Sequence, residues 1–344
     1  MQRAKLHFAI LDVLRAVAAV TVCLFHFNYR DGGALSAVLE YGNYGVEVFF
    51  VISGFVIPLA MNWSKFQYRD SWSFLIRRMI RLYPVFAIVA VGTLLCSTYG
   101  SSLLGYGGGE SGLTWYRALA NFTLTCNLLG ESWYLPVFWT LAIEAQYYVL
   151  IVLSFPLLVH REAWVRVLML LAWICISYLV GYTETVFSWT ALFGMGILVF
   201  LYREKKISPW LFVGLLALAA FSHQETRNLT SAGVGTLTVL CVLWSPDIRA
   251  QWLVKLGTIS YSLYLLHLTI GGAVLMHISL LPEQWQWVNH QVLGIALSLA
   301  VSVAVSILFY KYIELPIQQS SKLQNSSEEK GTRRAVSSNV SVPK

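Results

Sequence analysis

Long apolar runs separated by short polar connections dominate this chain. The first covers residues 8 to 28, and nine more occupy residues 44 to 61, 82 to 99, 133 to 158, 165 to 181, 186 to 202, 209 to 222, 230 to 245, 257 to 280 and 289 to 312. Most approach the roughly 20 residues that a helix needs to cross bilayer hydrocarbon. The pattern predicts an all-α polytopic membrane protein of about ten transmembrane helices enclosing a central cavity. Two runs, at 209 to 222 and 230 to 245, are short and require tilt or a locally thin bilayer.

Composition supports this fold class. Of the 344 residues, 57% are hydrophobic and only 12% are charged, whereas soluble domains carry charge on about a quarter of their residues. An ordinary soluble domain and a disordered chain are both excluded. The five cysteines are far apart and form no C-x-x-C pair, so they predict neither a zinc site nor a disulfide framework.

The first apolar run resembles a secretory signal in its position but not in its chemistry. Asp12 and Arg15 lie within it, and no small-residue cleavage site follows. We therefore expect it to be retained as the first transmembrane helix.

The basic residues predict the orientation of the chain. Twenty of the 24 lysines and arginines fall in connections on the side of the two termini, and only Arg30, Arg117 and Arg227 fall on the other side. By the positive-inside rule both termini are expected in the cytoplasm. A net charge of +7 that is spread over loops in this way does not indicate a nucleic-acid partner.

Two segments differ from the rest. The outward connection from residue 100 to 132 is glycine-rich and is expected to cover or flank an opening. After Pro316 the chain turns polar. This predicts a transmembrane domain over residues 1 to 316 and a disordered cytoplasmic tail over residues 317 to 344.

Ionisable side chains within apolar runs are the candidates for chemistry, because burying them in hydrocarbon is costly. They are Asp12, Arg15, His26, Glu47, Glu144, His267 and Glu314. The eleven positions from Arg15 to His26 correspond to about three helical turns, so both lie on one face, about 16 Å apart along the axis. Asp12 is placed to pair with Arg15.

That face suits a long anionic cosubstrate whose phosphates bind near Arg15 while an extended arm reaches His26. Coenzyme A thioesters have this shape. The same residues also fit a purely structural interpretation, in which Asp12 and Arg15 form a buried ion pair and His26 hydrogen-bonds a neighbouring helix.

Four further polar residues extend the candidate site. Arg77, Arg78 and Arg81 precede the third run, where Arg77 and Arg81 share a helical face and Pro84 begins the next span. They fit phosphate capture and positive-inside anchoring equally. Glu144 has no lysine or arginine within a turn, so its partner must come from another helix or from an acceptor hydroxyl, and His26 is one candidate.

Three weaker signals concern helix contacts. Ser53 and Gly54 predict a close approach to the first helix. Glu47, near the outer boundary, is interpreted as a helix cap. His267 follows Tyr264 by three residues on one face, and either lines an acceptor path or hydrogen-bonds another helix.

Five blocks resemble the acyltransferase-3 family of integral membrane acyltransferases. They are LDVLRAVAAVTVCLFHF, YGNYGVEVFFVISGFVI, FLIRRMIRLYP, SWYLPVFWTLAIEAQYYVL and ISYSLYLLHL, and they occur in the family's order over residues 11 to about 316. The most specific element is an arginine and a histidine separated by ten residues, here Arg15 and His26.

The resemblance implies transfer of an acyl group, most often acetyl, from cytoplasmic acyl-CoA to a hydroxyl of a glycan, lipid-linked sugar or natural product. His26 would perform the transfer and Arg15 would belong to the donor site. Arg77, Arg78 and Arg81 correspond to the family's basic loop, and Glu144 to the carboxylate of its fourth-span block.

His26 is expected to act as a general base or as a nucleophile that carries the acyl group. No metal is predicted, because His26 has no ligand partner at i+3 or i+4. An alternative function is a proton-coupled transporter or flippase of a sugar lipid or small anion that uses Arg15, His26 and Glu144 as its pathway. The five ordered blocks favour the enzyme.

Overall fold

The computed structural model describes residues 9–28, 33–99, 114–244, 250–282 and 291–320, and every regular element in these ranges is helical. The α-helices are α1 (Ala9–His26), α2 (Ala34–Glu40), α3 (Gly45–Trp63), α4 (Ser71–Tyr99), α6 (Trp115–Phe122), α7 (Cys126–Leu129), α8 (Phe138–Leu158), α9 (Ala163–Val180), α10 (Thr190–Arg203), α11 (Pro209–Thr226), α12 (Leu229–Trp244), α13 (Gln251–Thr258), α14 (Ser260–Ser279) and α15 (Gln291–Phe309). Short 3-10 turns are η1 (Tyr41–Tyr44), η2 (Tyr68–Asp70) and η3 (Val186–Trp189), and a π-helical turn, η5 (Tyr310–Glu314), follows α15.

All ten predicted apolar runs fall on helices, and seven described segments are long and apolar enough to cross a membrane. These are Ala9–His26, Ala34–Trp63, Phe138–Leu158, Ala163–Val180, Val186–Arg203, Ser260–Ser279 and Gln291–Ser320. The all-α membrane class is therefore confirmed. Ten crossings, and cytoplasmic termini, stay predictions.

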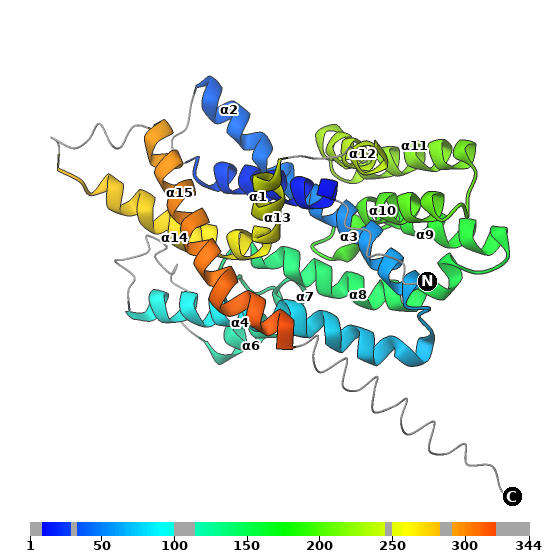
Figure 1. Cartoon of the computed structure of the whole chain (residues 1–344), viewed down its shortest axis with the longest axis horizontal. Coiled ribbons are helices and arrows are strands. Elements are labelled where there is room, and N and C mark those ends of the chain that lie inside the picture. Colours follow the sequence, from blue (N-terminus) through cyan, green and yellow to red (C-terminus); the bar gives the residue numbers. More distant parts are fainter. Residues whose placement is uncertain (1–8, 29–32, 100–113, 245–249, 283–290, 321–344) are drawn as a thin grey trace, which may run out of the picture.

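Helix α10 lies in the right-hand half of the molecule in Figure 1, where neighbouring helices enclose it. Twelve consecutive residues, from Thr190 to Leu201, are buried, as expected of a helix that is apolar on all sides and surrounded by other helices. Helices α3, α9, α11 and α12 pack around it.

Glycines allow α3 and α10 to approach closely. A β-carbon at Gly54 would collide with the backbone of Phe193, and one at Gly196 would collide with the backbone of Val51. Such contacts between small residues let two helix backbones pack directly against each other.

The expected partner of Gly54 was therefore wrong. It packs against α10 rather than the first helix, because a different pair of glycines serves that contact. Gly42 and Gly45, at the start of the same block, meet the backbone of α1 at Thr21 and Ala18.

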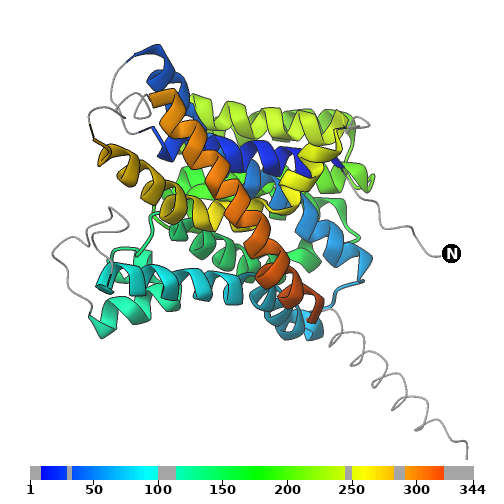
Figure 2. The same cartoon turned by 60° about the vertical axis from the view of Figure 1, so that its left-hand side comes forward.

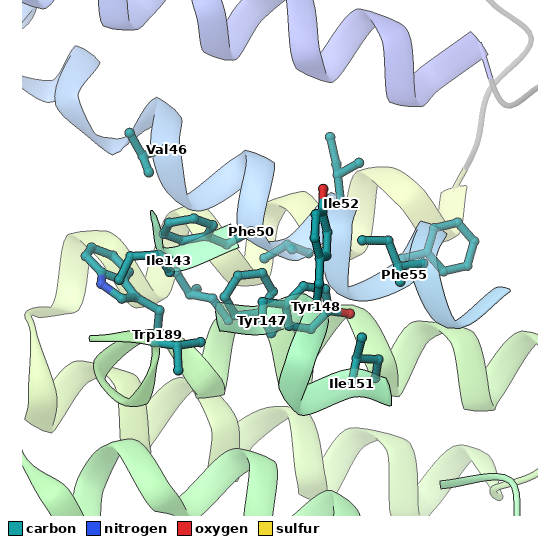
Figure 3. Close-up of a cluster of buried hydrophobic side chains, with 14 of the residues drawn as sticks. Val46, Phe50, Ile52, Phe55, Ile143, Tyr147, Tyr148, Ile151 and Trp189 are labelled. Carbon is teal, nitrogen blue, oxygen red and sulfur yellow. The ribbon is translucent and has the colours of Figure 1, made fainter. Parts of the chain in front are cut away.

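Aromatic rings join α3, α8 and α10 in the core (Figure 3). The ring of Tyr147 stacks on Phe193 with centroids 4.0 Å apart and an interplanar angle of 5°. Phe50 of α3 also packs against Phe193 of α10, with ring centroids 4.9 Å apart. This cluster fixes the position of α8, the helix that carries Glu144, relative to α3 and α10.

Helix α4 corrects the expected start of the third span. The sequence places Pro84 in the first turn of a helix, but α4 runs unbroken from Ser71 to Tyr99 with Pro84 inside it. The basic segment and the apolar run are thus one helix, so Arg77, Arg78 and Arg81 are held on a helical surface rather than in a loop.

Helices α14 and α15 complete the bundle by packing together beside α1, and α15 crosses the outside of the molecule obliquely (Figure 2). The helix that contains η5 continues to Ser320, four residues beyond the predicted domain boundary. The remainder of the predicted tail, residues 321 to 344, and the glycines between 105 and 112 lie outside the described residues.

Candidate active site

His26 is the last residue of α1, and its imidazole contacts a second histidine from a distant part of the chain. The His26 Nδ1 atom lies 2.9 Å from the Val22 carbonyl oxygen and 3.2 Å from Nε2 of His267. His267 lies on α14, where its Nδ1 atom is 2.7 Å from the Tyr264 carbonyl oxygen. Of the two alternatives for His267, a hydrogen bond to another helix is the one observed.

These contacts assign the protons of the pair. Only an N–H donates to a carbonyl, so Nδ1 carries the proton in both rings. Nε2 of neutral His267 then accepts from the Nδ1–H of His26. The nitrogen left with a free lone pair is Nε2 of His26, which makes this imidazole a candidate base.

His26 lines a cavity of about 260 Å³ at the end of the bundle where α1 ends. Residues from α1, η1, α3, α8, η3 and α14 contribute to its wall, together with the α11–α12 connection. The lining residues are Val22, Phe25, His26, Asn43, Tyr44, Val46, Glu47, Pro136, Val137, Trp139, Trp189, Arg227, Asn228 and Tyr264. Asn43 and Asn228 are exposed and mark the rim, so the cavity is accessible from that end.

One wall of the cavity is aromatic and carries a cation. The rings of Trp139 and Trp189 are stacked with centroids 5.2 Å apart. The Arg227 guanidinium carbon lies 4.3 Å from the Trp189 ring centroid and 4.8 Å from that of Tyr182. Among the described residues the guanidinium has no hydrogen bond and no ion pair within 4.0 Å.

Glu47 contributes a carboxylate to the same cavity. Its side chain is 3% exposed, and Oε1 accepts a hydrogen bond of 2.8 Å from Ser231 Oγ. The Ser231 hydroxyl in turn lies 2.7 Å from Nε2 of His223. The second oxygen, Oε2, is buried and has no partner among the described residues. Glu47 is therefore a buried, half-satisfied cavity residue and not simply a helix cap.

A second cluster of charges surrounds Arg15, toward the other end of α1. Asp12 lies 3.7 Å from the Arg15 guanidinium, as the sequence predicted. Arg15 also interacts electrostatically with Arg81, Glu144 and Arg78. The fold thus gathers three of the four predicted donor-site cations around one carboxylate from α8.

Aromatic and phenolic groups hold this arginine cluster in place. The Arg78 guanidinium carbon lies 5.3 Å from the ring centroid of Phe74 and 6.0 Å from that of Tyr148. The Tyr148 hydroxyl donates a 2.5 Å hydrogen bond to Glu144. Glu144 therefore has Tyr148 and the arginines as neighbours, whereas the direct partner of His26 is His267.

Arg77 is the predicted site residue that the structure leaves apart. Its side chain is exposed and makes no hydrogen bond or ion pair with any described residue. Arg77 and Arg81 share a face of α4 as the spacing predicts, but Arg78 and Arg81, three positions apart, are the pair that interacts electrostatically with Arg15.

The cavity and the arginine cluster occupy different parts of one helix. Because α1 is unbroken, Arg15 and His26 lie about 16 Å apart along its axis. No residue of the cluster lines the cavity. The chamber found in the described residues thus lies at the His26 end of the bundle and not at its centre.

Two further cavity residues received no role from the sequence. Trp189 ends η3, directly before α10, and gives no spacing signal that separates it from a membrane-boundary tryptophan. Arg227 was counted only as one of three outward basic residues. That rarity is the signal that could have singled it out, since a basic residue on the sparsely charged side is the exception.

Comparison with known proteins adds an independent finding. A family model described as an acyltransferase domain matches residues 8–311. The peptidoglycan O-acetyltransferase OatA of Listeria monocytogenes is 26% identical, in an alignment that covers 90% of this chain and 55% of the relative. The O-acetyltransferase OatA of Staphylococcus aureus is 24% identical over 89% of this chain and 46% of the relative.

The chain thus spans about half the length of these curated relatives. No solved structure matches it significantly.

Proposed function

Because this chain belongs to the acyltransferase family, we propose that it is an O-acetyltransferase that moves an acetyl group from cytoplasmic acyl-CoA to a glycan hydroxyl across the membrane. The observation that carries the proposal is the free Nε2 of His26 at an open cavity, on the same helix as a cluster of arginines. The printed names of two relatives, which are O-acetyltransferases and in one case specify peptidoglycan, support a glycan acceptor.

The arginine cluster is suited to the donor. Arg15, Arg78 and Arg81 supply three guanidiniums, which bind phosphate oxygens through paired N–H donors. Asp12 and Glu144 offset part of this charge and leave an excess of one positive charge. A donor phosphate would restore the balance, with the thioester arm directed along α1 toward His26.

His26 would act as a general base on the acceptor. Its Nε2 removes the proton from the acceptor hydroxyl while that oxygen attacks the thioester carbonyl carbon. The tetrahedral intermediate then releases the coenzyme A thiolate, which takes the proton from His26 Nε2–H. One C–S bond is broken, one C–O bond is formed, and the imidazole returns to its starting state.

His267 would position His26 in this cycle. Its Nε2 accepts the Nδ1–H of His26, which keeps the lone pair on the opposite nitrogen and stabilises the imidazolium that forms during transfer. A covalent route, in which His26 Nε2 attacks the thioester and passes the acetyl group to the acceptor, uses the same geometry.

Glu144 would serve the donor side. Its carboxylate lies among Arg15, Arg78 and Tyr148, so it orders guanidiniums that touch the donor. This assignment keeps Glu144 necessary for turnover and makes its main effect a change in donor affinity.

The test is acetyl transfer by the purified full chain, with labelled acetyl-CoA and a peptidoglycan-derived oligosaccharide. We expect His26→Gln to abolish transfer, because the lone pair on Nε2 is lost. His277→Gln is the matched control, since His277 is an exposed histidine on α14 and should leave the rate unchanged.

Two results would contradict the proposal. Transfer that survives in His26→Gln would remove the base from the mechanism. Gradient-dependent uptake of a sugar lipid without acetylation would instead support a transporter.

A further inference from the structure

Glu314 is a buried carboxylate that the transfer chemistry does not use. Only 2% of its surface is exposed, although it lies in a helix on the outside of the bundle. Its Oε2 atom accepts a hydrogen bond from the hydroxyl of Ser262 on α14, and Oε1 accepts one of 2.8 Å from the Gln318 amide. Burying a carboxylate in this region is costly, so a carboxylate fixed by two hydrogen bonds is a candidate for a specific role.

The π-helical turn η5 turns Glu314 toward α14. Ser298, Ser302 and Ser306 are buried on one side of α15, and a β-carbon at Gly271 of α14 would lie 3.0 Å from Ser302 Oγ. In a regular α-helix, the eight positions from Ser306 to Glu314 span about 800°, which is about 80° away from that side. The π turn takes up one extra residue, so the span is equivalent to about 700° and Glu314 returns to the side of the serines. Such turns are frequent at functional sites.

Tyr261, the neighbour of Ser262, connects this part of α14 to the donor helix α4. Its hydroxyl donates a 2.7 Å hydrogen bond to the carbonyl oxygen of Leu82, the residue after Arg81. Pro84 lies inside α4 and has no N–H, so the turn before it lacks one internal hydrogen bond. The hydrogen bond from Tyr261 therefore supports that turn from a neighbouring helix.

The two groups act on the same guanidinium. The Glu314 carboxylate interacts electrostatically with Arg81, and the Tyr261 phenol interacts with both. No ion pair within 4.0 Å joins Arg81 to Glu314 in the part of the chain that the structure describes. Arg81 is itself exposed, so its N–H groups remain accessible to a ligand.

We propose that Tyr261 and Glu314 are positioning residues of the donor site, which hold Arg81 where it binds a phosphate of acyl-CoA. This inference rests on the proposed function and deepens it, because it assigns the support of the donor site to α14 and η5. Helix α14 also carries His267, the partner of His26. One helix would thus position both a donor-binding cation and the base.

Charge alone predicts the opposite effect for Glu314. A carboxylate near a phosphate-binding arginine repels an anionic donor, so removing its charge would lower the KM for the donor if repulsion were its only contribution. If the carboxylate keeps Arg81 in place, removing its charge raises that KM. The direction of the change therefore distinguishes a positioning residue from a bystander.

The experiment compares two thioester donors that differ in their phosphates. Acetyl-CoA carries the nucleotide phosphates, whereas S-acetylpantetheine has the same thioester arm and no phosphate. Equilibrium binding of each labelled donor to the purified full chain is measured without acceptor. Acetyl transfer from each donor to the oligosaccharide is measured separately.

Tyr261→Phe removes one hydroxyl and keeps the ring. We expect it to raise the Kd and KM for acetyl-CoA about threefold to tenfold, as for loss of one hydrogen bond, with kcat and the values for S-acetylpantetheine nearly unchanged. Glu314→Gln keeps the size of the side chain and should raise the KM for acetyl-CoA by a similar factor. A general packing defect would instead affect both donors.

Tyr83→Phe is the matched control. Tyr83 also lies on α4, two residues after Arg81, and its hydroxyl donates a 2.9 Å hydrogen bond to the Phe122 carbonyl oxygen of α6. The variant removes the same kind of hydrogen bond from the same helix, but one directed away from α14. Its KM for acetyl-CoA should stay within about twofold of wild type.

The outcomes separate the positioning role from the proposed function. Transfer with equal changes for both donors in Tyr261→Phe, or with equal effects of Tyr261→Phe and Tyr83→Phe, overturns the positioning role and leaves the proposed function intact. An unchanged or lower KM in Glu314→Gln overturns the role of Glu314. Weaker acetyl-CoA binding in Tyr261→Phe, without transfer by any chain, supports the positioning role and contradicts the proposed function. A wild-type chain that does not bind acetyl-CoA overturns both.

Discussion

The hydrogen bond between His26 and His267 joins two side chains that are 241 positions apart in sequence. Replacing His267 with leucine keeps apolar volume but removes one of the two acceptors of the His26 Nδ1–H and leaves only the Val22 carbonyl oxygen. We expect His267→Leu to lower kcat for acetyl transfer by about tenfold to a hundredfold, as loss of supporting hydrogen bonds typically does, with little change in the KM for the donor.

His267→Gln is the informative comparison. The glutamine carbonyl oxygen can accept the same Nδ1–H, so this variant should recover much of the lost kcat. If glutamine and leucine reduce the rate equally while both proteins remain folded, His267 has a packing role and does not position the base.

The arginines of α4 give a second test, because adjacent residues face different surroundings. Arg78 lies over Tyr148 near Glu144, whereas Arg77 is exposed. Arg78→Gln should raise the KM for acetyl-CoA about tenfold to a hundredfold through loss of a charged hydrogen-bond donor.

Arg77→Gln is the matched control, and its KM should stay within about twofold of wild type. Both variants remove one positive charge from the same helical turn, so an anchoring role would affect them alike. Equal effects on KM would therefore contradict the assignment of the donor phosphates to Arg15, Arg78 and Arg81.

Residue-scale predictions succeeded where helix periodicity was sufficient. The spacing of Asp12, Arg15 and His26 on α1 could be read from the sequence, and so could the pairing of Asp12 with Arg15. The identity of the partner of His26 could not, because it depends on how α14 packs against α1. The shared face of Arg77 and Arg81 was predicted from their spacing, but spacing alone does not tell which of the three arginines approach Arg15.

Among the contacts between helices, the close packing of α3 against α10 is the one that glycines make possible. Gly196→Ala adds a β-carbon that collides with the backbone of Val51, which no side-chain rotation relieves. We expect the variant to lose about 1 to 3 kcal/mol of stability. Thermal unfolding of the purified protein in detergent should show a lower midpoint.

Gly214→Ala on α11 is the control, because no atom lies within 4 Å of its added β-carbon. There the substitution should be neutral or stabilising by up to about 1 kcal/mol through higher helix propensity. An unchanged midpoint in Gly196→Ala would show that α3 and α10 are not packed as described.

Apolar periodicity located all ten helical runs but not their continuity. Pro84 indicated a helix start, yet α4 passes through it, since packing against α8 and α14 stabilises the helix on both sides of the proline. Similarly, Gly54 predicted a close contact between helices, but the sequence did not indicate which helix it approaches. Both outcomes depend on tertiary packing that no local window of sequence contains.

The orientation of the chain in the membrane determines which substrate reaches each end of the molecule. With ten crossings, the rim of the cavity faces away from the cytoplasm and the α3–α4 connection faces it. We expect a cysteine introduced at Asn228 to react with a membrane-impermeant maleimide in intact cells, and one at Ser64 to react only after permeabilisation, since both positions are exposed.

The native cysteines provide the background measurement for this experiment, and the unmodified chain is labelled in parallel. Labelling of Ser64→Cys in intact cells would show that the orientation of the chain is opposite to the one predicted. That result would also place the arginine cluster on the side that lacks a cytoplasmic donor.

In the proposed mechanism, a donor held by the arginines on one side of the membrane and an acceptor in the opposite cavity meet at His26. Proteoliposomes of known orientation test this most directly, with labelled acetyl-CoA added on the arginine-cluster side and the oligosaccharide on the cavity side. The account predicts labelled oligosaccharide with the wild-type chain and none with His26→Gln. Transfer that requires both substrates on the same side, or that continues without His26, would contradict it.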